Sequence, residues 1–325
     1  MRIVIDKEIP YLESCVTTHW PDVQVCALDG LSINAAAVQD ADVLVVRTRT
    51  KVDATLLHGS RVCLVCTATI GFDHIDTAYC DLAGIRWTAC PGCNAQAVCD
   101  YIEEALLETT SPDMPLTLGV VGFGHVGSKV AEMAGRRGLR VLLNDPPKCL
   151  GVDLSTIARE CDIITFHTPL THDGPYPTWH LCDASFLNQT KPSALIINAA
   201  RGGVVDEQAL LQSNRRFVLD TWENEPDISP EVVARAERAS MHIAGYSLEG
   251  KRNATQMCLD AIADTFALPK ITVSIEPSDG DSTPGWLSRI SSALKNAVQV
   301  STQVTKNMIT VSESFERLRK NYLLR

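Results

Sequence analysis

The stretch LTLGVVGFGHVGSKVAEMAGRRGLRVLLND, residues 116–145, decides the fold. LTLGVVG is typical of a buried strand, GHVGSKVAEMAGRRG predicts a helix closed by glycine, and LRVLLND predicts the next strand. Gly122, Gly124 and Gly127 form a G-x-G-x-x-G pattern where the first strand meets the helix. This order of strand, glycine turn, helix and strand indicates a dinucleotide-binding unit.

Each glycine of this turn has a separate expected task. Gly122 permits the tight turn, Gly124 lets the backbone approach a pyrophosphate, and Gly127 allows the helix to pack closely on the strand. The helix N-terminus offers unpaired N–H groups to the phosphates. Asp145 ends the second strand, where its carboxylate would bind the adenosine ribose hydroxyls and repel a 2′-phosphate. NAD is therefore favoured over NADP, a preference that Lys148 weakens slightly.

Strand-like runs alternate with helical or polar stretches on both sides of this unit. The runs are RIVID, VQVCAL, DVLVVRT, VCLVCTA and IRWTAC before it, and CDIITFH, ALIINAA, RFVLDT and MHIAGY after it. Such alternation predicts an α/β protein with mostly parallel sheets. We expect two doubly wound, Rossmann-like domains with a cleft between them, plus a small C-terminal α+β segment.

Composition limits the class of protein. The 325 residues, 45% hydrophobic and 21% charged, are typical of a globular chain with about two domains. A net charge of −10 argues against a nucleic-acid partner. No apolar run reaches the ~18 residues of a membrane helix, and the N-terminus does not resemble a signal peptide. We therefore expect a cytoplasmic protein that does not bind membranes.

Twelve cysteines in a chain without a secretory signal do not predict a disulfide framework. Cys63-x-x-Cys66 and Cys90-x-x-Cys93 have metal-like spacing. Cys63 and Cys66 lie in a predicted strand, however, where residues three apart point to opposite faces. We expect no metal site, with a zinc site and a redox dithiol as the alternatives.

Arg201, Glu225 and His242 follow three successive predicted strands, at the edge where open α/β sheets bind ligands. An imidazole titrates near neutral pH, so His242 suits the base that takes a proton when a secondary alcohol loses hydride. A carboxylate beside it would hold the ring, and arginine can bind a substrate carboxylate through two N–H groups. The alternative is a structural histidine and a solvated arginine.

Motifs along nearly the whole chain resemble those of the D-isomer-specific 2-hydroxyacid dehydrogenases. They are VRTRTKV (46–52), TAT (67–69), GFDHID (71–76), PGCNA (91–95), DPP (145–147), FHTPL (166–170), DGPY (173–176), HIAGYSLEGK (242–251) and FERLRKNY (315–322). The PGCNA, DGPY and HIAGY motifs resemble those of family members that act on 4-phospho-D-erythronate. The resemblance implies oxidation of this phosphorylated hydroxyacid at C2 with NAD, as a step in pyridoxal 5′-phosphate biosynthesis.

The resemblance also assigns roles to single residues. His242 becomes the acid/base, with Arg201 and Glu225 as its catalytic partners. The implied cofactor contacts, beyond the three glycines, are Asp145, Thr168, Ala199, Ala200, Arg201, Asp220 and Gly245. Alanine stands at 200 where the family commonly has cysteine, which should be harmless because the backbone makes that contact. The implied substrate contacts are Thr48, Thr69 and Tyr246, and Arg47 and Lys51 are candidates for the substrate phosphate because they flank Thr48.

The domain division is likewise implied by the resemblance. Residues 1–94, completed by about 247–265, would form the substrate-binding domain, and 95–246 the NAD-binding domain. Residues 266–325 would form a shortened dimerisation-type segment, and a homodimer is expected. Two other functions stay open: dehydrogenation of another D-2-hydroxyacid, such as 3-phosphoglycerate, and a non-catalytic protein that senses NAD(H) through the same fold.

Overall fold

The computed structural model describes residues 1–111, 115–274, 283–303 and 310–322, and the chain divides into two units. Unit 1 comprises residues 1–94 and 246–278, and unit 2 comprises residues 95–245 and 279–325. The cleft predicted between the domains concerns how the two units meet and stays a prediction. None of the described helices is both long and apolar enough to cross a membrane.

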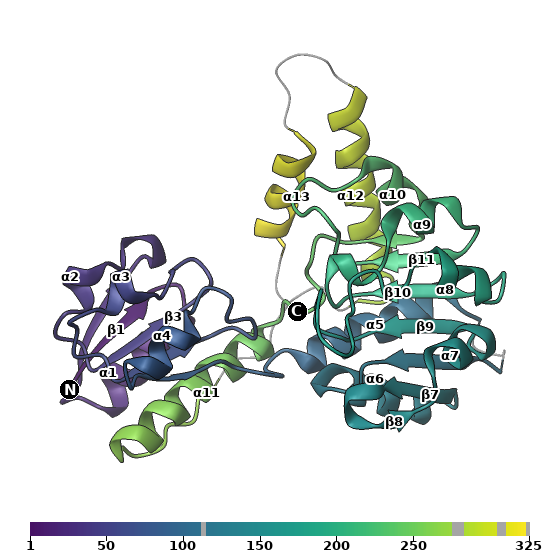
Figure 1. Cartoon of the computed structure of the whole chain (residues 1–325). Helices are drawn as coiled ribbons and strands as arrows, with labels where there is room; N and C mark the ends of the chain where they lie inside the picture. The colour runs from purple at the N-terminus through teal and green to yellow at the C-terminus, as the bar shows by residue number, and fades with distance from the viewer. Residues whose placement is uncertain (112–114, 275–282, 304–309, 323–325) are drawn as a thin grey trace. The chain divides into compact units, whose positions relative to one another are not determined.

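Unit 1 is built on a five-stranded parallel sheet in the order β2-β1-β3-β4-β5 (Figure 1). Its strands are β1 (Arg2–Asp6), β2 (Gln24–Leu28), β3 (Val43–Val46), β4 (Leu64–Thr67) and β5 (Arg86–Thr88). Its helices are α1 (Leu12–His19), α2 (Ala35–Val38), α3 (Ala54–Leu57), α4 (Thr77–Leu82) and α11 (Leu248–Phe266). All five strands predicted in this region are confirmed.

Two apolar layers cover the two faces of this sheet. Side chains of α1 and α11 form one layer, which includes Leu12, Val16 and Ile262. Side chains of α2, α3 and α4 form the other, which includes Val38 and Leu57. Because both faces are covered, the strands are almost continuous apolar runs, as in other parallel sheets. The segments that leave the strands begin at the carboxyl edge of the sheet.

Unit 2 contains a seven-stranded sheet in the order β12-β11-β10-β9-β6-β7-β8, parallel except for the β7–β8 pair. Its strands are β6 (Thr117–Val121), β7 (Arg140–Asp145), β8 (Leu150–Gly151), β9 (Ile163–Phe166), β10 (Leu195–Asn198), β11 (Arg216–Leu219) and β12 (Arg238–Ala239). Its helices are α5 (Ala95–Thr109), α6 (His125–Arg136), α7 (Leu154–Glu160), α8 (Ala184–Gln189), α9 (Glu207–Gln212), α10 (Pro230–Arg235), α12 (Trp286–Gln303) and α13 (Val311–Lys320).

The predicted fold class, with two parallel, Rossmann-like sheets, is confirmed. Two details differ. The C-terminal segment, predicted as α+β, contains two helices and no strand among the described residues of 283–303 and 310–322. The strand predicted at residues 241–246 lies earlier, at Arg238–Ala239, and the chain has already left the sheet at Met241. His242 adopts φ +56°, a left-handed conformation that cannot continue a strand.

Candidate functional site

The glycine turn of unit 2 has the geometry that a dinucleotide requires. Gly122 adopts φ +91°, and a Cβ on Gly127 would lie 1.9 Å from the Gly122 carbonyl oxygen. A Cβ on Gly124, by contrast, would meet no atom within 4 Å. Gly122 and Gly127 are therefore required by the fold itself, whereas Gly124 borders open space at the N-terminus of α6. A diphosphate can approach the backbone there.

Asp145 lies at the carboxyl end of β7, next to the turn. Its Oδ2 accepts a hydrogen bond of 2.8 Å from the Phe123 N–H, and the Lys148 ammonium lies 3.8 Å away. The carboxylate thus fixes the glycine turn and stands where an adenosine ribose would lie in this type of fold. The residues present fit NAD.

The neighbouring strand exits carry the remaining candidate cofactor contacts. Thr168 follows β9, and its buried hydroxyl has no hydrogen-bond partner among the described residues. Its methyl group approaches the Gly122 turn, 3.0 Å from where a Cβ would stand. A buried hydroxyl without a partner is costly, and a bound ligand can supply the missing hydrogen bond.

Asn198, which the sequence analysis missed, shapes the turn after β10. Its side chain accepts from the Ala200 N–H (3.1 Å) and donates to the Arg201 carbonyl (2.8 Å). Ala199 and Ala200 are therefore held by the Asn198 side chain, and Arg201 stands exposed at the end of the turn. The Asn-Ala-Ala-Arg-Gly-Gly sequence contained this signal, because asparagine is a common side-chain template for turns.

His242 and Glu225 lie together at the exits of β12 and β11. The His242 Nδ1 is 2.7 Å from Glu225 Oε2, and the other oxygen, Oε1, accepts the Trp222 N–H at 2.9 Å. With the Nδ1 hydrogen donated to Glu225, Nε2 is the nitrogen left to exchange a proton with a ligand. A ring nitrogen held by a carboxylate is the usual arrangement of a general base.

Arg201 lies on a segment that packs against the one carrying Glu225. A Cβ on Gly202 would lie 1.8 Å from the Trp222 carbonyl oxygen, so only glycine permits this approach. The Arg201 guanidinium donates to the Ala200 carbonyl (2.7 Å) and is exposed. The structure thus brings the segments of Arg201, Glu225 and His242 to the exits of three adjacent strands, β10, β11 and β12.

Asp220 fixes the segment that carries His242 through buried hydrogen bonds. Its carboxylate is fully buried and accepts from the Ser240 hydroxyl (2.6 Å) and from the Ile243 and Ala244 N–H groups (2.8 and 2.9 Å). Its own carbonyl accepts the His242 N–H at 2.8 Å. All these contacts are within the protein, so Asp220 positions the segment from residue 240 to Gly245. The cofactor contacts assigned to Asp220 and Gly245 stay predictions.

A second cluster, also missed by the sequence analysis, links the Glu225 segment to α9. Glu207 and Glu223 bind each other reciprocally: each carboxylate accepts the other residue's backbone N–H at 2.9 Å. The two ring nitrogens of His180 lie 3.1 Å from Glu223 Oε1 and 3.6 Å from Asp206 Oδ2. This His180 cluster therefore connects Glu223 with Asp206, the residue that precedes α9.

The His180 cluster is expected to make stability depend on pH. Burial raises the pKa of Glu207 to about 7, with Glu223 and Glu225 adding repulsion. Between the ordinary pKa of a glutamate and about 7, the Glu207 carboxyl is therefore protonated in the folded state and ionised in the unfolded state. The contribution of this protonation difference to the unfolding free energy is fully present in acid and is lost as pH rises toward about 7. It amounts to at most about 3 kcal/mol.

Glu207→Gln is the variant that isolates this effect, because its amide oxygen can still accept the Glu223 N–H but cannot ionise. We expect the melting temperature of the wild type to fall relative to that of Glu207→Gln between pH 5 and 8. Thermal unfolding across that range measures it. Parallel curves for the two proteins would contradict a proton held at Glu207.

Two of the three predicted substrate residues, Thr48 and Thr69, follow strands at the carboxyl edge of the sheet in unit 1. Thr69 follows β4, where its hydroxyl bonds to the Thr67 hydroxyl (2.7 Å) and donates to the Gly71 carbonyl (2.8 Å). Thr48 is exposed in the turn after β3, and Tyr246 is half-buried at the start of the returning segment. The roles assigned to these three residues stay predictions.

The two cations beside Thr48 differ in their surroundings. The Arg47 guanidinium binds the buried Asp6 carboxylate, with Nε 2.9 Å from Oδ2 and Nη2 3.3 Å from Oδ1. Lys51, in contrast, is largely exposed and pairs with Asp53 at 3.0 Å. Only Arg47 is held at the edge of the sheet.

The four cysteines with metal-like spacing do not share one site. Cys63 is exposed and its thiol donates to the Asp42 carbonyl, whereas Cys66 and Cys90 are buried in the core of unit 1. Cys90 lies instead beside Cys258, with the two sulfur atoms 3.8 Å apart. These four cysteines therefore do not converge on one site, and the expected absence of a metal stays a prediction.

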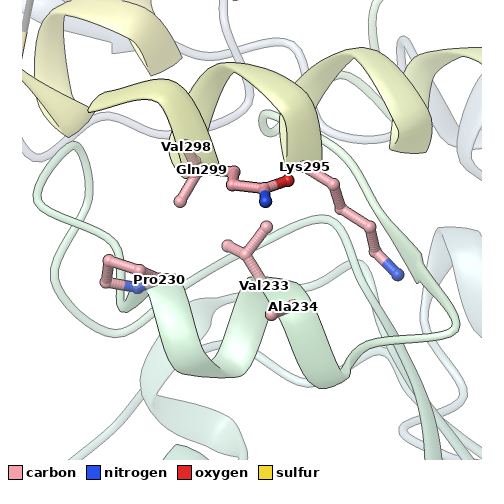
Figure 2. A pocket seen from close by; sticks show the side chains of 6 residues that line it. All are labelled: Pro230, Val233, Ala234, Lys295, Val298 and Gln299. Atoms are coloured by element: carbon pink, nitrogen blue, oxygen red, sulfur yellow. The ribbon is translucent and has the colours of Figure 1, made fainter. Parts of the chain in front are cut away.

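A hollow of about 400 Å³ lies between α10 and α12 in unit 2 (Figure 2). Pro230, Val233 and Ala234 line it from α10, and Lys295, Val298 and Gln299 line it from α12. None of the candidate cofactor or catalytic residues lines this hollow. It is therefore separate from the site at the strand exits.

Comparison with known proteins identifies the family of this chain. Residues 110–244 match the family described as "D-isomer specific 2-hydroxyacid dehydrogenase, NAD binding domain". The erythronate-4-phosphate dehydrogenase of Bacteroides thetaiotaomicron is 41% identical to this chain, over all of it and 97% of the relative. That of Enterobacter sp. (strain 638) is 38% identical, over all of this chain and 92% of the relative.

Solved structures share the fold. A D-isomer specific 2-hydroxyacid dehydrogenase from Lactobacillus delbrueckii ssp. bulgaricus, in its NAD-complexed form, matches with a TM-score of 0.68. The match covers 85% of this chain and 100% of that one at 22% identity. At this identity the likeness concerns the fold alone.

Proposed function

The chain belongs to the D-isomer specific 2-hydroxyacid dehydrogenases and is an NAD-dependent enzyme, and on that premise we propose that it oxidises 4-phospho-D-erythronate. The product is 2-oxo-3-hydroxy-4-phosphobutanoate, and the reaction is a step in pyridoxal 5′-phosphate biosynthesis. The observation that carries the chemistry is the 2.7 Å contact between His242 Nδ1 and Glu225 at a strand exit. Support for the substrate comes from the relatives named erythronate-4-phosphate dehydrogenase.

His242 acts as the base. Its Nε2 takes the proton of the C2 hydroxyl, and the Glu225 carboxylate stabilises the imidazolium that forms. Bound at the glycine turn of unit 2, NAD would supply the acceptor for the hydride from C2. Arg201 binds the carboxylate at C1 through two N–H groups and so orients C2. In the reverse direction His242 returns the proton to the carbonyl oxygen.

The cofactor is held by residues of unit 2. The open backbone at Gly124 accommodates the pyrophosphate, and Asp145 binds the ribose hydroxyls and disfavours NADP. The unpaired Thr168 hydroxyl and the backbone of Ala199 to Arg201 complete the contacts. A homodimer stays part of this proposal.

The test is NADH formation by the purified full chain with NAD and 4-phospho-D-erythronate, alongside 3-phosphoglycerate and D-lactate. A parallel assay with a 2-oxoacid acceptor covers a cofactor that does not dissociate. We expect selective turnover of phosphoerythronate, and faster turnover with NAD than with NADP. Preferential turnover of another hydroxyacid would contradict the proposed substrate but leave the proposed mechanism standing. NAD binding without turnover in either assay would favour an NAD(H)-sensing protein.

A further inference from the structure

The carboxyl edge of unit 1 has a point at which its chain order reverses. β1 lies between β2 and β3 in the sheet, so the connections from β1 and β3 leave on opposite faces. Open α/β sheets bind ligands at such a point. Asp6 ends β1 and Arg47 follows β3, so their ion pair lies at this position.

The two-pronged pairing fixes Arg47 there. Asp6 has no exposed surface, and both of its oxygens contact the guanidinium. Arg47 itself is about one-third exposed, with 33% of its side-chain surface accessible. The buried Asp6 carboxylate therefore holds the guanidinium in place, and the exposed part of the guanidinium stays accessible to a ligand.

Lys251, on α11, lies close enough to Arg47 for the two charges to repel each other. Thr255 lies one turn further along the same face of this helix and donates to the Pro10 carbonyl at 2.8 Å. Pro10 belongs to the segment after β1, so this hydrogen bond holds the Lys251 face of α11 beside that segment. Lys251 is half-buried, and it forms no ion pair with any residue that the structure describes.

The charges at this position favour binding of an anion. Burial lowers the pKa of Lys251, repulsion from Arg47 lowers it further, and the exposed Glu8 opposes both effects. Two cations held close together, one of them half-buried, are costly unless an anion lies between them. Glu8 is exposed and can move aside, whereas Asp6 is already occupied by Arg47.

We propose that Arg47 and Lys251 bind the phosphate group of the substrate, an inference that rests on the proposed function. A phosphate monoester carries two negative charges, which match a guanidinium with free N–H groups and an ammonium. Arg201 is used by the carboxylate beside the reacting carbon, so the phosphate at the other end of the substrate needs separate cations. Lys251 takes the place that the sequence analysis gave to Lys51, whose ammonium pairs with Asp53.

The test is Lys251→Met, which keeps the length and apolar stem of the side chain. We expect the KM for 4-phospho-D-erythronate to rise about 10- to 100-fold, with kcat nearly unchanged, because a charged contact away from the reacting atoms is lost. The KM for unphosphorylated D-erythronate should not change. Lys251→Arg should restore most of the affinity, and Lys270→Met, at an exposed lysine of unit 1 paired with Asp264, serves as the matched control.

Calorimetric titration of the full chain with inorganic phosphate separates this inference from the proposed function. Phosphate binding by the wild type that is lost in Lys251→Met supports the site even if phosphoerythronate is not turned over. Turnover of phosphoerythronate with the same KM in the wild type and Lys251→Met would overturn the site and leave the function standing. An equal rise in KM for D-erythronate would also overturn it, because the phosphate would then not be the group bound.

Discussion

His242→Asn is expected to lower kcat about 10³-fold, within the 10²- to 10⁴-fold range that a general base contributes. Asparagine has no group that can take the hydroxyl proton, so the transition state loses its proton acceptor. Asparagine is chosen because His242 adopts φ +56°, and among residues with a side chain asparagine tolerates this conformation well. The measurements are steady-state kinetics and NAD affinity by fluorescence titration.

NAD binding serves as the control for this variant, because His242 is not among the residues assigned to the cofactor. We expect NAD affinity and melting temperature to stay close to those of the wild type. Glu225→Gln should lose less activity than His242→Asn, because the imidazole remains and only its charged partner is removed. Retention of more than a tenth of the wild-type kcat by His242→Asn would remove His242 from the role of base.

The cofactor half of the site was predictable because its geometry is local. Gly122, Gly124, Gly127 and Asp145 lie within one strand–helix–strand unit, so their order along the chain already determines their positions. The structure agrees with the separate tasks predicted for them: a Cβ on Gly127 would collide with the turn, whereas a Cβ on Gly124 would stand in the open space through which a diphosphate approaches.

The side-chain contacts that fix the catalytic segments were not predictable, because the residues that make them lie far apart in sequence. Glu207 and Glu223 bind each other's backbone, and His180 joins them from the segment before α8. Each of these side chains alone is indistinguishable from a solvated surface residue. The same holds for Lys251, which comes within electrostatic range of Arg47 only because α11 returns to unit 1.

The strand prediction near His242 failed for a local reason. MHIAGY has the apolar character of a strand, but Met241, Ile243 and Ala244 are buried because Asp220 draws the backbone around its carboxylate. A buried acceptor for two N–H groups replaces the partners that a sheet would have provided. Apolar character predicted burial here, and it could not distinguish a strand from a segment wrapped around a buried carboxylate.

Asp220→Ala is therefore expected to have the second large effect, on stability and activity together. The change leaves the Ile243 and Ala244 N–H groups without their acceptor in a fully buried place, and the Ser240 hydroxyl keeps only its hydrogen bond with the Tyr101 hydroxyl. We expect the unfolding free energy to fall by about 3–5 kcal/mol, measured by urea unfolding without NAD. Because the same segment carries His242, kcat should fall as well.

Asp220→Asn separates this positioning role from the cofactor contact that the resemblance implies. Its amide oxygen can accept from Ser240 and Ile243, but its NH₂ group would face the Ala244 N–H, so stability should fall by an intermediate amount. A contact with NAD alone would produce a different result: weaker NAD binding with the unfolding free energy of the wild type. Loss of stability in the absence of NAD would instead establish that Asp220 acts on catalysis by holding the segment on which His242 stands.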